Sequence, residues 1–174
     1  MRLASEGNLI VYPLIVIFGI TFAFSYLTEF DILYIQIIIF VVLVFCLNFF
    51  RDPSRIIPKN KNSIISPADG KIIKIKEFED PESGKKLKLI SIFLSVFNVH
   101  ANRMPVDGKF INVKYVKGDF LAAFDHRASE KNERMEISID TEFGVIVVKQ
   151  IAGLVARRIL CYAKESKKML AGDR

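Results

Sequence analysis

Two apolar segments near the start of the chain constrain its fold more than any other feature. They cover Leu9–Leu27 and Ile32–Phe50, and each has 19 residues without Asp, Glu, Lys, Arg or His. A helix of that length is about 28 Å long, which is close to the thickness of the hydrocarbon core of a bilayer. Only the four residues 28–31 join the segments. This pattern predicts a transmembrane helical hairpin over residues 1–50.

Two other structures are compatible with an apolar N-terminal segment but explain less. A secretory signal peptide has one short apolar stretch and a cleavage site of small residues, whereas here a second long segment follows at once. A hairpin buried in a soluble protein needs a large domain around it, and only 124 residues follow Phe50. Pro13 and Gly19 lie in the first segment, but transmembrane helices tolerate both residue types.

The charges beside the two segments predict their orientation. The connection carries Glu29 and Asp31 and no basic residue, whereas basic residues lie before the first segment and after the second. Because basic flanks stay on the inner side, we expect the following domain on the cytoplasmic side of the cell membrane. Cys46 lies within the second segment and Cys161 far from it, so we predict no disulfide between them. The flanking basic residues are Arg2, Arg51, Arg55, Lys59 and Lys61.

The remainder of the chain is basic. The whole chain has a net charge of +6, and residues 1–50 carry one basic and three acidic side chains, which leaves +8 for residues 51–174. A basic domain tethered at a cytoplasmic leaflet is attracted to anionic phospholipids. Nucleic acid is the other usual partner, but the tether and the absence of a nucleic-acid-binding motif argue against it. Solubility alone is a third explanation. The sequence leaves open whether the chain forms a homo-oligomer.

Six short runs of β-forming residues predict that residues 51–174 are mainly β. Turn signals such as Pro81–Gly84 and Phe143-Gly144 separate the runs. The run Leu87–Val96 is almost continuously apolar, as expected of a strand buried on both faces. Short strands with little helix between them predict a compact β barrel or sandwich, and Gly118–Arg134 is predicted to be a long loop or short helix. The predicted strands are Lys71–Phe78, Leu87–Val96, Lys109–Val116, Glu136–Asp140, Val145–Ile151 and Val155–Ala163.

Three polar segments are candidates for chemistry, and we predict no metal site. His100 follows a predicted strand and precedes a turn, and an imidazole exchanges protons near neutral pH; a strand-end histidine bonded to backbone would have the same pattern. Asp69 lies in the turn Ser66–Lys71, either as a turn former or as a carboxylate that orients an imidazole. Lys131–Arg134 is either a solvated charge run or a set of donors for an anionic substrate.

Taken together, these segments resemble the short form of the phosphatidylserine decarboxylase family, including archaeal relatives that act on archaetidylserine. The resemblance covers nearly the whole chain, with the membrane hairpin included. In chain order it rests on Phe50–Arg55, Ser66–Lys71, Asn98–Gly108, Phe120-Leu121 with Ala128–Arg134, and Gln150–Ile159.

The resemblance implies a lyase of phospholipid biosynthesis that is made as a zymogen. Such a precursor cuts itself at a Gly-Ser bond near its C-terminus, and the serine becomes a pyruvoyl group on a small α chain. The larger β chain keeps the membrane segment. The pyruvoyl group binds the substrate amine and takes up electrons as carbon dioxide leaves. The substrate would be phosphatidylserine, giving phosphatidylethanolamine, or the corresponding archaeal ether lipid.

The resemblance also implies roles for individual residues. Asp69 matches an aspartate that the family uses in self-cleavage. His100 matches a histidine near the pyruvoyl group, suited to donating a proton after carbon dioxide leaves. We expect substrate contacts from Arg103, Asn132, Glu133 and Arg134.

The chain departs from the family pattern in two ways. Arg103 stands where the long-form enzymes have a second histidine as cleavage base, and arginine cannot act as a base near neutral pH. His100 then serves both steps, or processing differs. The sequence also contains no Gly-Ser dipeptide before it reaches Arg174. We therefore expect most of a β chain whose α chain is separate, a shortened precursor, or an inactive paralogue. The alternative function is a non-catalytic, membrane-tethered β domain that binds lipid or acts as an adaptor.

Overall fold

The computed structural model describes residues 2–28, 30–58, 60, 62–80, 84–122, 125 and 127–174. Residues 81–83 of the turn predicted at Pro81–Gly84 lie outside these residues, as do the charged residues Glu29, Lys59 and Lys61. Backbone contacts divide the chain into two compact units. The first comprises Met1–Ile56 and Ala68–Ala101, and the second comprises Ile57–Pro67 and Asn102–Arg174.

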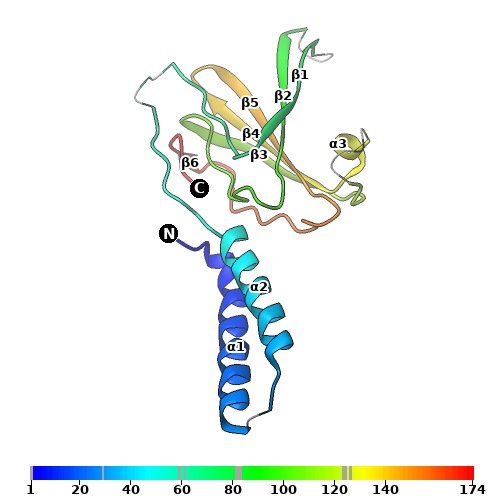
Figure 1. Cartoon of the computed structure of the whole chain (residues 1–174). Coiled ribbons are helices and arrows are strands. Elements are labelled where there is room, and N and C mark those ends of the chain that lie inside the picture. Colours follow the sequence, from blue (N-terminus) through cyan, green and yellow to red (C-terminus); the bar gives the residue numbers. More distant parts are fainter. Residues whose placement is uncertain are drawn as a thin grey trace. The chain divides into compact units, whose positions relative to one another are not determined.

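Two apolar helices form the N-terminal part of the first unit and lie side by side (Figure 1). A short 3-10 helix, η1 (Ser5–Gly7), leads into α1 (Asn8–Thr28), and α2 (Leu33–Phe49) follows. The side-chain amide of Gln36 donates a hydrogen bond to the carbonyl of Thr21 at 3.1 Å, which links the two helices. The structure therefore contains the two adjacent apolar helices that the sequence predicts.

The two helices differ in length. Among the described residues, the continuous helical stretch Ser5–Thr28, of 24 residues, is long and apolar enough to cross a bilayer, whereas Leu33–Phe49 has 17 residues and is shorter. Only 6% of the most apolar part of the longer helix is buried, and Leu9 is 86% exposed. An apolar surface of this kind suits a membrane better than water, so the structure contains one helix that weakly indicates membrane association.

A two-stranded hairpin completes the ordered elements of the first unit. Strands β1 (Lys71–Glu79) and β2 (Lys86–Phe93) pair antiparallel, with a bulge between Ile72 and Lys74. The prediction that the second run is buried on both faces is wrong, because most of β2 is exposed and Ile90 is 49% exposed. A two-stranded sheet has no second layer of its own, so a continuous apolar run does not by itself bury a strand.

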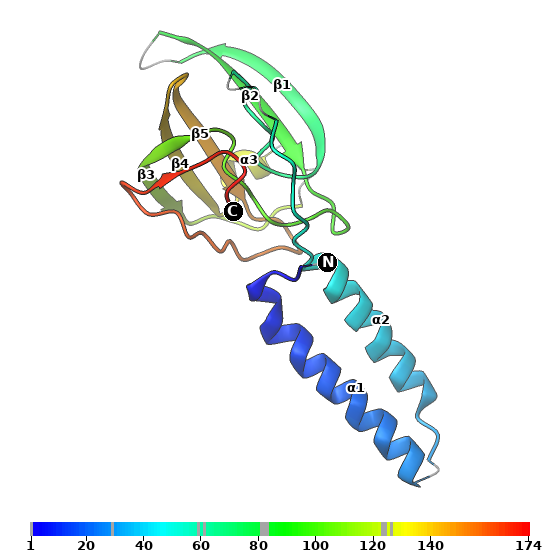
Figure 2. The same ribbon diagram turned by 90° about the vertical axis from the view of Figure 1, so that its left-hand side faces the viewer.

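The second unit is built on a curled four-stranded antiparallel sheet with the order β5-β4-β3-β6 (Figure 2). Buried side chains from β3 and β4 form its core with Met104, and partly buried side chains, Cys161 among them, pack against it. Cys46 and Cys161 are both free thiols. The elements are β3 (Gly108–Val116), α3 (Ala128–Lys131), β4 (Arg134–Thr141), β5 (Gly144–Ile151) and β6 (Lys168–Met169).

The prediction of a mainly β domain is confirmed, and five of the six predicted strands are present within a few residues of their predicted bounds. The sixth, Val155–Ala163, is wrong: this segment forms no strand, and local bonds such as Gly153 N–H to the Ala156 carbonyl at 2.9 Å fold it back on itself. The last strand is instead Lys168–Met169, which pairs with Gly108 and Lys109 of β3. Closure into a barrel or sandwich stays a prediction.

Candidate functional site

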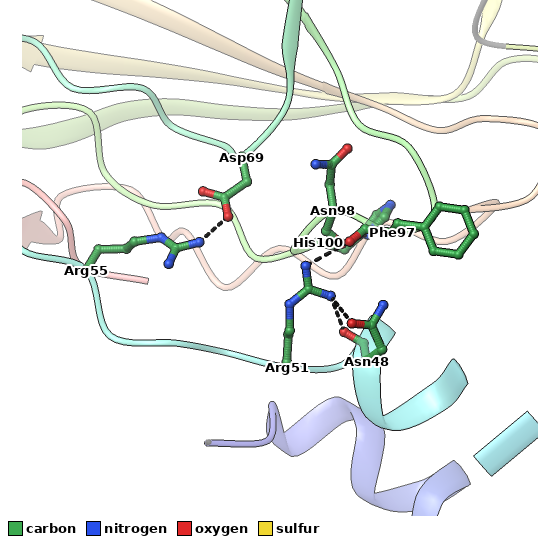
Figure 3. Close-up of polar contacts among 7 residues, drawn as sticks. All are labelled: Asn48, Arg51, Arg55, Asp69, Phe97, Asn98 and His100. Atoms are coloured by element: carbon green, nitrogen blue, oxygen red, sulfur yellow. Dashed lines mark hydrogen bonds and ion pairs between the residues drawn. The ribbon is translucent and has the colours of Figure 1, made fainter. Parts of the chain in front are cut away.

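The two predicted catalytic residues lie on the chain segments that enter and leave the open end of the β1–β2 hairpin. Lys71 opposite Phe93 is the first pair of the ladder, so the turn that ends in Asp69 and Gly70 lies beside the exit of β2. Gly70 is required there, because a Cβ atom at this position would lie 2.5 Å from the Phe93 carbonyl oxygen. Asp69 therefore precedes the hairpin at the end from which the loop to His100 leaves (Figure 3).

Asp69 forms an ion pair with Arg55, in which the guanidinium Nη2 donates to the carboxylate Oδ2. Both side chains are partly exposed, at 39% for Asp69 and 42% for Arg55. The carboxylate is thus engaged by an arginine and does not bond to the imidazole of His100. This pair joins two residues that lie 14 positions apart within the segment that connects α2 to β1.

The loop after β2 is organised by Asn98. The Asn98 side-chain oxygen accepts hydrogen bonds from the amide and the hydroxyl of Ser95, both at 2.8 Å. The Asn98 carbonyl then accepts a bond from Nδ1 of His100 at 3.0 Å. Because a carbonyl oxygen only accepts, Nδ1 carries the hydrogen, and the neutral imidazole keeps its lone pair on Nε2. The backbone of Asn98 therefore orients the imidazole in the way that was predicted for Asp69.

The C-terminal end of α2 supplies the other contacts of His100. The ring of Phe49, the last residue of the helix, stacks on the imidazole with the centroids 4.3 Å apart and the planes inclined by 26°. Arg51 follows two residues later and donates from Nη2 to the carbonyl of Phe97 at 2.7 Å (Figure 3). The helix end and the His100 loop are therefore joined by one stacked ring pair and one charge-assisted hydrogen bond.

The surroundings of His100 favour its neutral form. Burial lowers the pKa of the imidazole below its ordinary value of 6.5, since water is removed from the charged form. The bond to the Asn98 carbonyl opposes this shift, and the positive charge of Arg51 lowers the pKa further. At neutral pH the isolated site therefore holds a largely neutral imidazole with an available Nε2.

Asn132 has a structural position in the second unit. It is fully buried, with 0% exposure. Its side-chain oxygen accepts the Leu121 amide at 2.9 Å, and its side-chain nitrogen donates to the carbonyls of Leu121 and Ala152 at 2.9 and 2.8 Å. The amide thus ties together three stretches of backbone. A side chain used in this way has little left to offer a substrate.

Glu133 and Arg134 lie next to Asn132 and are also engaged within the second unit. The hydroxyl of Tyr115 donates to the Glu133 carboxylate, and this bond raises the pKa of Tyr115. Nε of Arg134 donates to Glu136 at 2.7 Å, and this bond is the main reason why the pKa of Glu136 is lowered. The two predicted substrate ligands therefore have intramolecular partners on β3 and β4.

Arg103 follows His100 by three residues but belongs to the second unit. Its backbone amide donates to the Pro67 carbonyl at 2.8 Å, and its Nη1 donates to the Gly172 carbonyl at 3.2 Å. Within the second unit, these bonds connect Arg103 to the segment that ends at Pro67 and to the segment near Gly172. The guanidinium of Arg103 is a hydrogen-bond donor that cannot accept a proton near neutral pH.

Three residues of the site are not predicted from the sequence as partners of His100: Phe49, Arg51 and Asn98. In the sequence, Arg51 is distinguished only by its charge and by the segment Phe50–Arg55, and Phe49 only as part of an apolar run. Asn98 lies two positions before His100, and an Asn ahead of a turn is a signal that its side chain organises local backbone. No sequence pattern predicts a stacked pair between residues 51 positions apart.

The chain is similar to known proteins over most of its length. A family model described as phosphatidylserine decarboxylase matches residues 42–174. That range contains every residue of the site described above, from Phe49 to Arg134.

The matched relatives are phosphatidylserine decarboxylase proenzymes. The one from Chlorobaculum parvum is 44% identical over 139 residues, which cover 80% of this chain and 65% of the relative. The one from Chlorobaculum tepidum is 48% identical over 132 residues, covering 76% and 61%. The one from Wolbachia pipientis wMel is 51% identical over 135 residues, covering 74% and 59%. The chain thus spans about three fifths of the length of these curated relatives.

Proposed function

The chain belongs to the phosphatidylserine decarboxylase family, and we propose that it forms most of the large subunit of a pyruvoyl-dependent aminophospholipid decarboxylase. The substrate would be phosphatidylserine, with phosphatidylethanolamine as product, or the corresponding archaeal ether lipid. The pyruvoyl group would be carried by a small α chain released from the same precursor. The similarity of the chain to phosphatidylserine decarboxylase proenzymes supports this proposal.

One observation supports the proposal most strongly: His100 stacks on Phe49, the last residue of the apolar helix α2. If α1 and α2 span a membrane, the residue at the end of α2 lies at the level of the lipid headgroups. A proton-exchanging side chain held at that depth suits a reaction on a headgroup.

The proposed role of His100 is to take up a proton at Nε2, which carries a lone pair in the neutral imidazole, and to deliver that proton to the carbon that loses carbon dioxide. The Asn98 carbonyl fixes the Nδ1–H tautomer, so the opposite nitrogen faces the reacting atom in one defined orientation. The Phe49 ring limits rotation of the imidazole and keeps water from one of its faces. Asp69, paired with Arg55, is proposed to act in self-cleavage.

The residues present fit the cofactor that the family implies. A pyruvoyl group supplies an electron sink for the bond that breaks when carbon dioxide leaves. What that chemistry needs from the protein is a proton donor beside the carbon, and the half-buried imidazole with one fixed nitrogen is of the right kind. We propose that Asp69 and His100 line the position of the group.

The domain arrangement and location belong to the same proposal. Residues 1–50 would form a two-helix membrane hairpin, and residues 51–174 a cytoplasmic catalytic domain that closes as a β barrel or sandwich. An anionic phospholipid membrane would be the partner surface. Arg103, Glu133 and Arg134 would contact substrate, although each has intramolecular bonds to give up first. Asn132 would support those contacts from its buried position.

The test is to express the complete reading frame that contains this chain and to purify the product from membranes. We expect mass spectrometry to find a second, small chain with a blocked N-terminus, and we expect carbon dioxide release from phosphatidylserine. His100→Ala should abolish that release, whereas His126→Ala, which changes the only other histidine, should not. A single uncut chain that binds lipid without releasing carbon dioxide would support the non-catalytic alternative instead.

A further inference from the structure

Arg51 is anchored at the junction between α2 and the loop that carries His100. Its backbone forms an isolated antiparallel bridge with Leu3. The neighbouring Phe50 carbonyl accepts the Ala4 amide at 2.8 Å. The residue that follows the helix is thus held by the start of the chain, and its side chain projects from a fixed backbone rather than from a free linker.

The guanidinium of Arg51 is held entirely by neutral oxygens. Nη1 donates to the carbonyl and the side-chain oxygen of Asn48 at 2.7 and 2.6 Å, and Nη2 donates to the Phe97 carbonyl at 2.7 Å. A guanidinium has five N–H donors, so these bonds leave one on Nε and one on Nη2. Arg55 is neutralised by Asp69, but no carboxylate among the described residues forms an ion pair with Arg51.

The charge of Arg51 acts on His100. The Phe97 carbonyl that Arg51 holds lies three residues before His100, and Phe49, two residues before Arg51, stacks on the imidazole. Of the charged groups around this ring in the described chain, Arg51 is the one whose charge lowers the pKa of His100. A cation beside an imidazole disfavours the protonated form of that imidazole. This arrangement is therefore unfavourable for proton donation unless an anion binds beside Arg51.

We propose that the two remaining donors of Arg51 bind an anionic phosphate oxygen of the lipid headgroup, and that this anion lets His100 keep its proton while substrate is bound. The proposal rests on the proposed function, because it makes Arg51 the phosphate ligand of that same site. Arginine suits this role, since its planar fork matches phosphate oxygens and stays charged at all relevant pH values. Substrate binding and protonation of His100 would then be coupled.

The test measures the pKa of His100 by NMR, using the full chain in neutral-detergent micelles. The probes are glycerophosphoethanolamine, which carries the phosphodiester, ethanolamine, which lacks it, and inorganic phosphate. His100→Phe identifies the His100 signals. We expect glycerophosphoethanolamine, but not ethanolamine, to raise the pKa of His100 by at least about 0.3, as for a partly screened charge pair.

Variants separate the role of Arg51 from a general effect of charge. In Arg51→Gln the pKa of His100 should be higher without any probe and should not respond to glycerophosphoethanolamine. Arg158→Gln removes an exposed arginine of the second unit and should respond as the wild type does.

Three results would overturn the proposal: no response in the wild type, an equal response in Arg51→Gln, or a response to inorganic phosphate without one to the phosphodiester. The last would identify a site for free phosphate. None of these measurements needs decarboxylation. If the proposed function fails, carbon dioxide release is absent while the response of His100 persists.

Discussion

Asp69 precedes the β1–β2 hairpin and His100 follows it, and the two residues have different partners, which separates their expected roles. Asp69 is bound to Arg55, whereas His100 is bound to a backbone carbonyl and an aromatic ring. A carboxylate held by an arginine has a fixed position and suits the orientation of groups during self-cleavage. The imidazole retains one available nitrogen and suits proton transfer during turnover.

We expect Asp69→Asn in the full precursor to leave an uncut band on a denaturing gel, because the neutral amide loses both the charge and the ion pair with Arg55. Glu77→Gln is the matched control, since Glu77 also forms an exposed ion pair, with Lys88, but lies away from the turn. Cleavage of Asp69→Asn at the rate of the control would contradict the assignment.

The lowered pKa of His100 predicts how stability depends on pH. A histidine whose pKa is lower in the folded state favours folding fully above its ordinary value of 6.5, and this contribution is lost as the pH falls through the folded pKa. We therefore expect the Tm of the wild type to fall relative to His100→Phe as the pH decreases below 6.5. The Phe variant keeps a ring against Phe49 but cannot titrate. Parallel Tm curves for the two proteins between pH 7.5 and about 5 would refute this.

At the scale of elements, the second unit depends on one buried amide. Asn132 ends α3 and bonds to backbone groups of Leu121 and Ala152, while Gly118 lies so close to the Lys131 carbonyl that a Cβ atom would overlap it. The loop before β4 is therefore closed by side-chain amide bonds and a tight backbone crossing rather than by apolar packing.

Removing that amide should be costly. We expect Asn132→Ala to reduce the free energy of unfolding by about 3 kcal/mol, because three backbone groups lose their hydrogen-bond partner and the bond to the Ala152 carbonyl is buried. The measurement is urea unfolding of the full chain in micelles. Asn112→Ala changes an exposed asparagine of β3 and should have almost no effect. Equal midpoints for the two variants would show that water replaces the lost bonds.

Strands were predictable where apolar and polar residues alternate in the sequence and where neighbouring strands are available for pairing. Glu136–Asp140 alternates buried isoleucines with polar residues and lies between two other strands. Val155–Ala163 has similar composition, but local bonds such as Arg157 N–H to the Val155 carbonyl take the place of a ladder. The two-residue β6 is too short to give any pattern, since its pairing with β3 depends on a contact distant in sequence.

The site was predictable in part for the same reason. Asp69 lies in the turn before β1, and His100 follows the turn after β2, so both are near local turn signals in the sequence. Asn132 was grouped with its charged neighbours because sequence does not distinguish a buried amide from a solvated one. The partners Phe49 and Arg51 depend on where the helix ends relative to a loop about 50 positions later, which only the three-dimensional structure determines.

At the scale of the whole molecule, the helices have two consequences for function. They provide the apolar surface expected to enter a bilayer, and the end of α2 also holds Arg51 and His100 through Asn48 and Phe49. A membrane anchor that only concentrated the enzyme at its substrate would not need these contacts. Removal of the helices should therefore affect access to lipid and, to a smaller degree, the orientation of the imidazole.

We expect deletion of residues 1–50 to leave the sheet of the second unit folded, because its core of Met104, Phe110, Ile137 and Ile139 lies wholly within that unit. In the processed enzyme, activity on phosphatidylserine in vesicles should fall at least about tenfold more than activity on dispersed short-chain phosphatidylserine, since only the first substrate depends on the tether. Phe49→Ala in the full-length enzyme is the control for lost stacking, and it should reduce both activities by the same factor. If the deletion also reduced both activities equally, the helices would serve the site and not access to the bilayer, and the proposal of a membrane hairpin would lose its functional support.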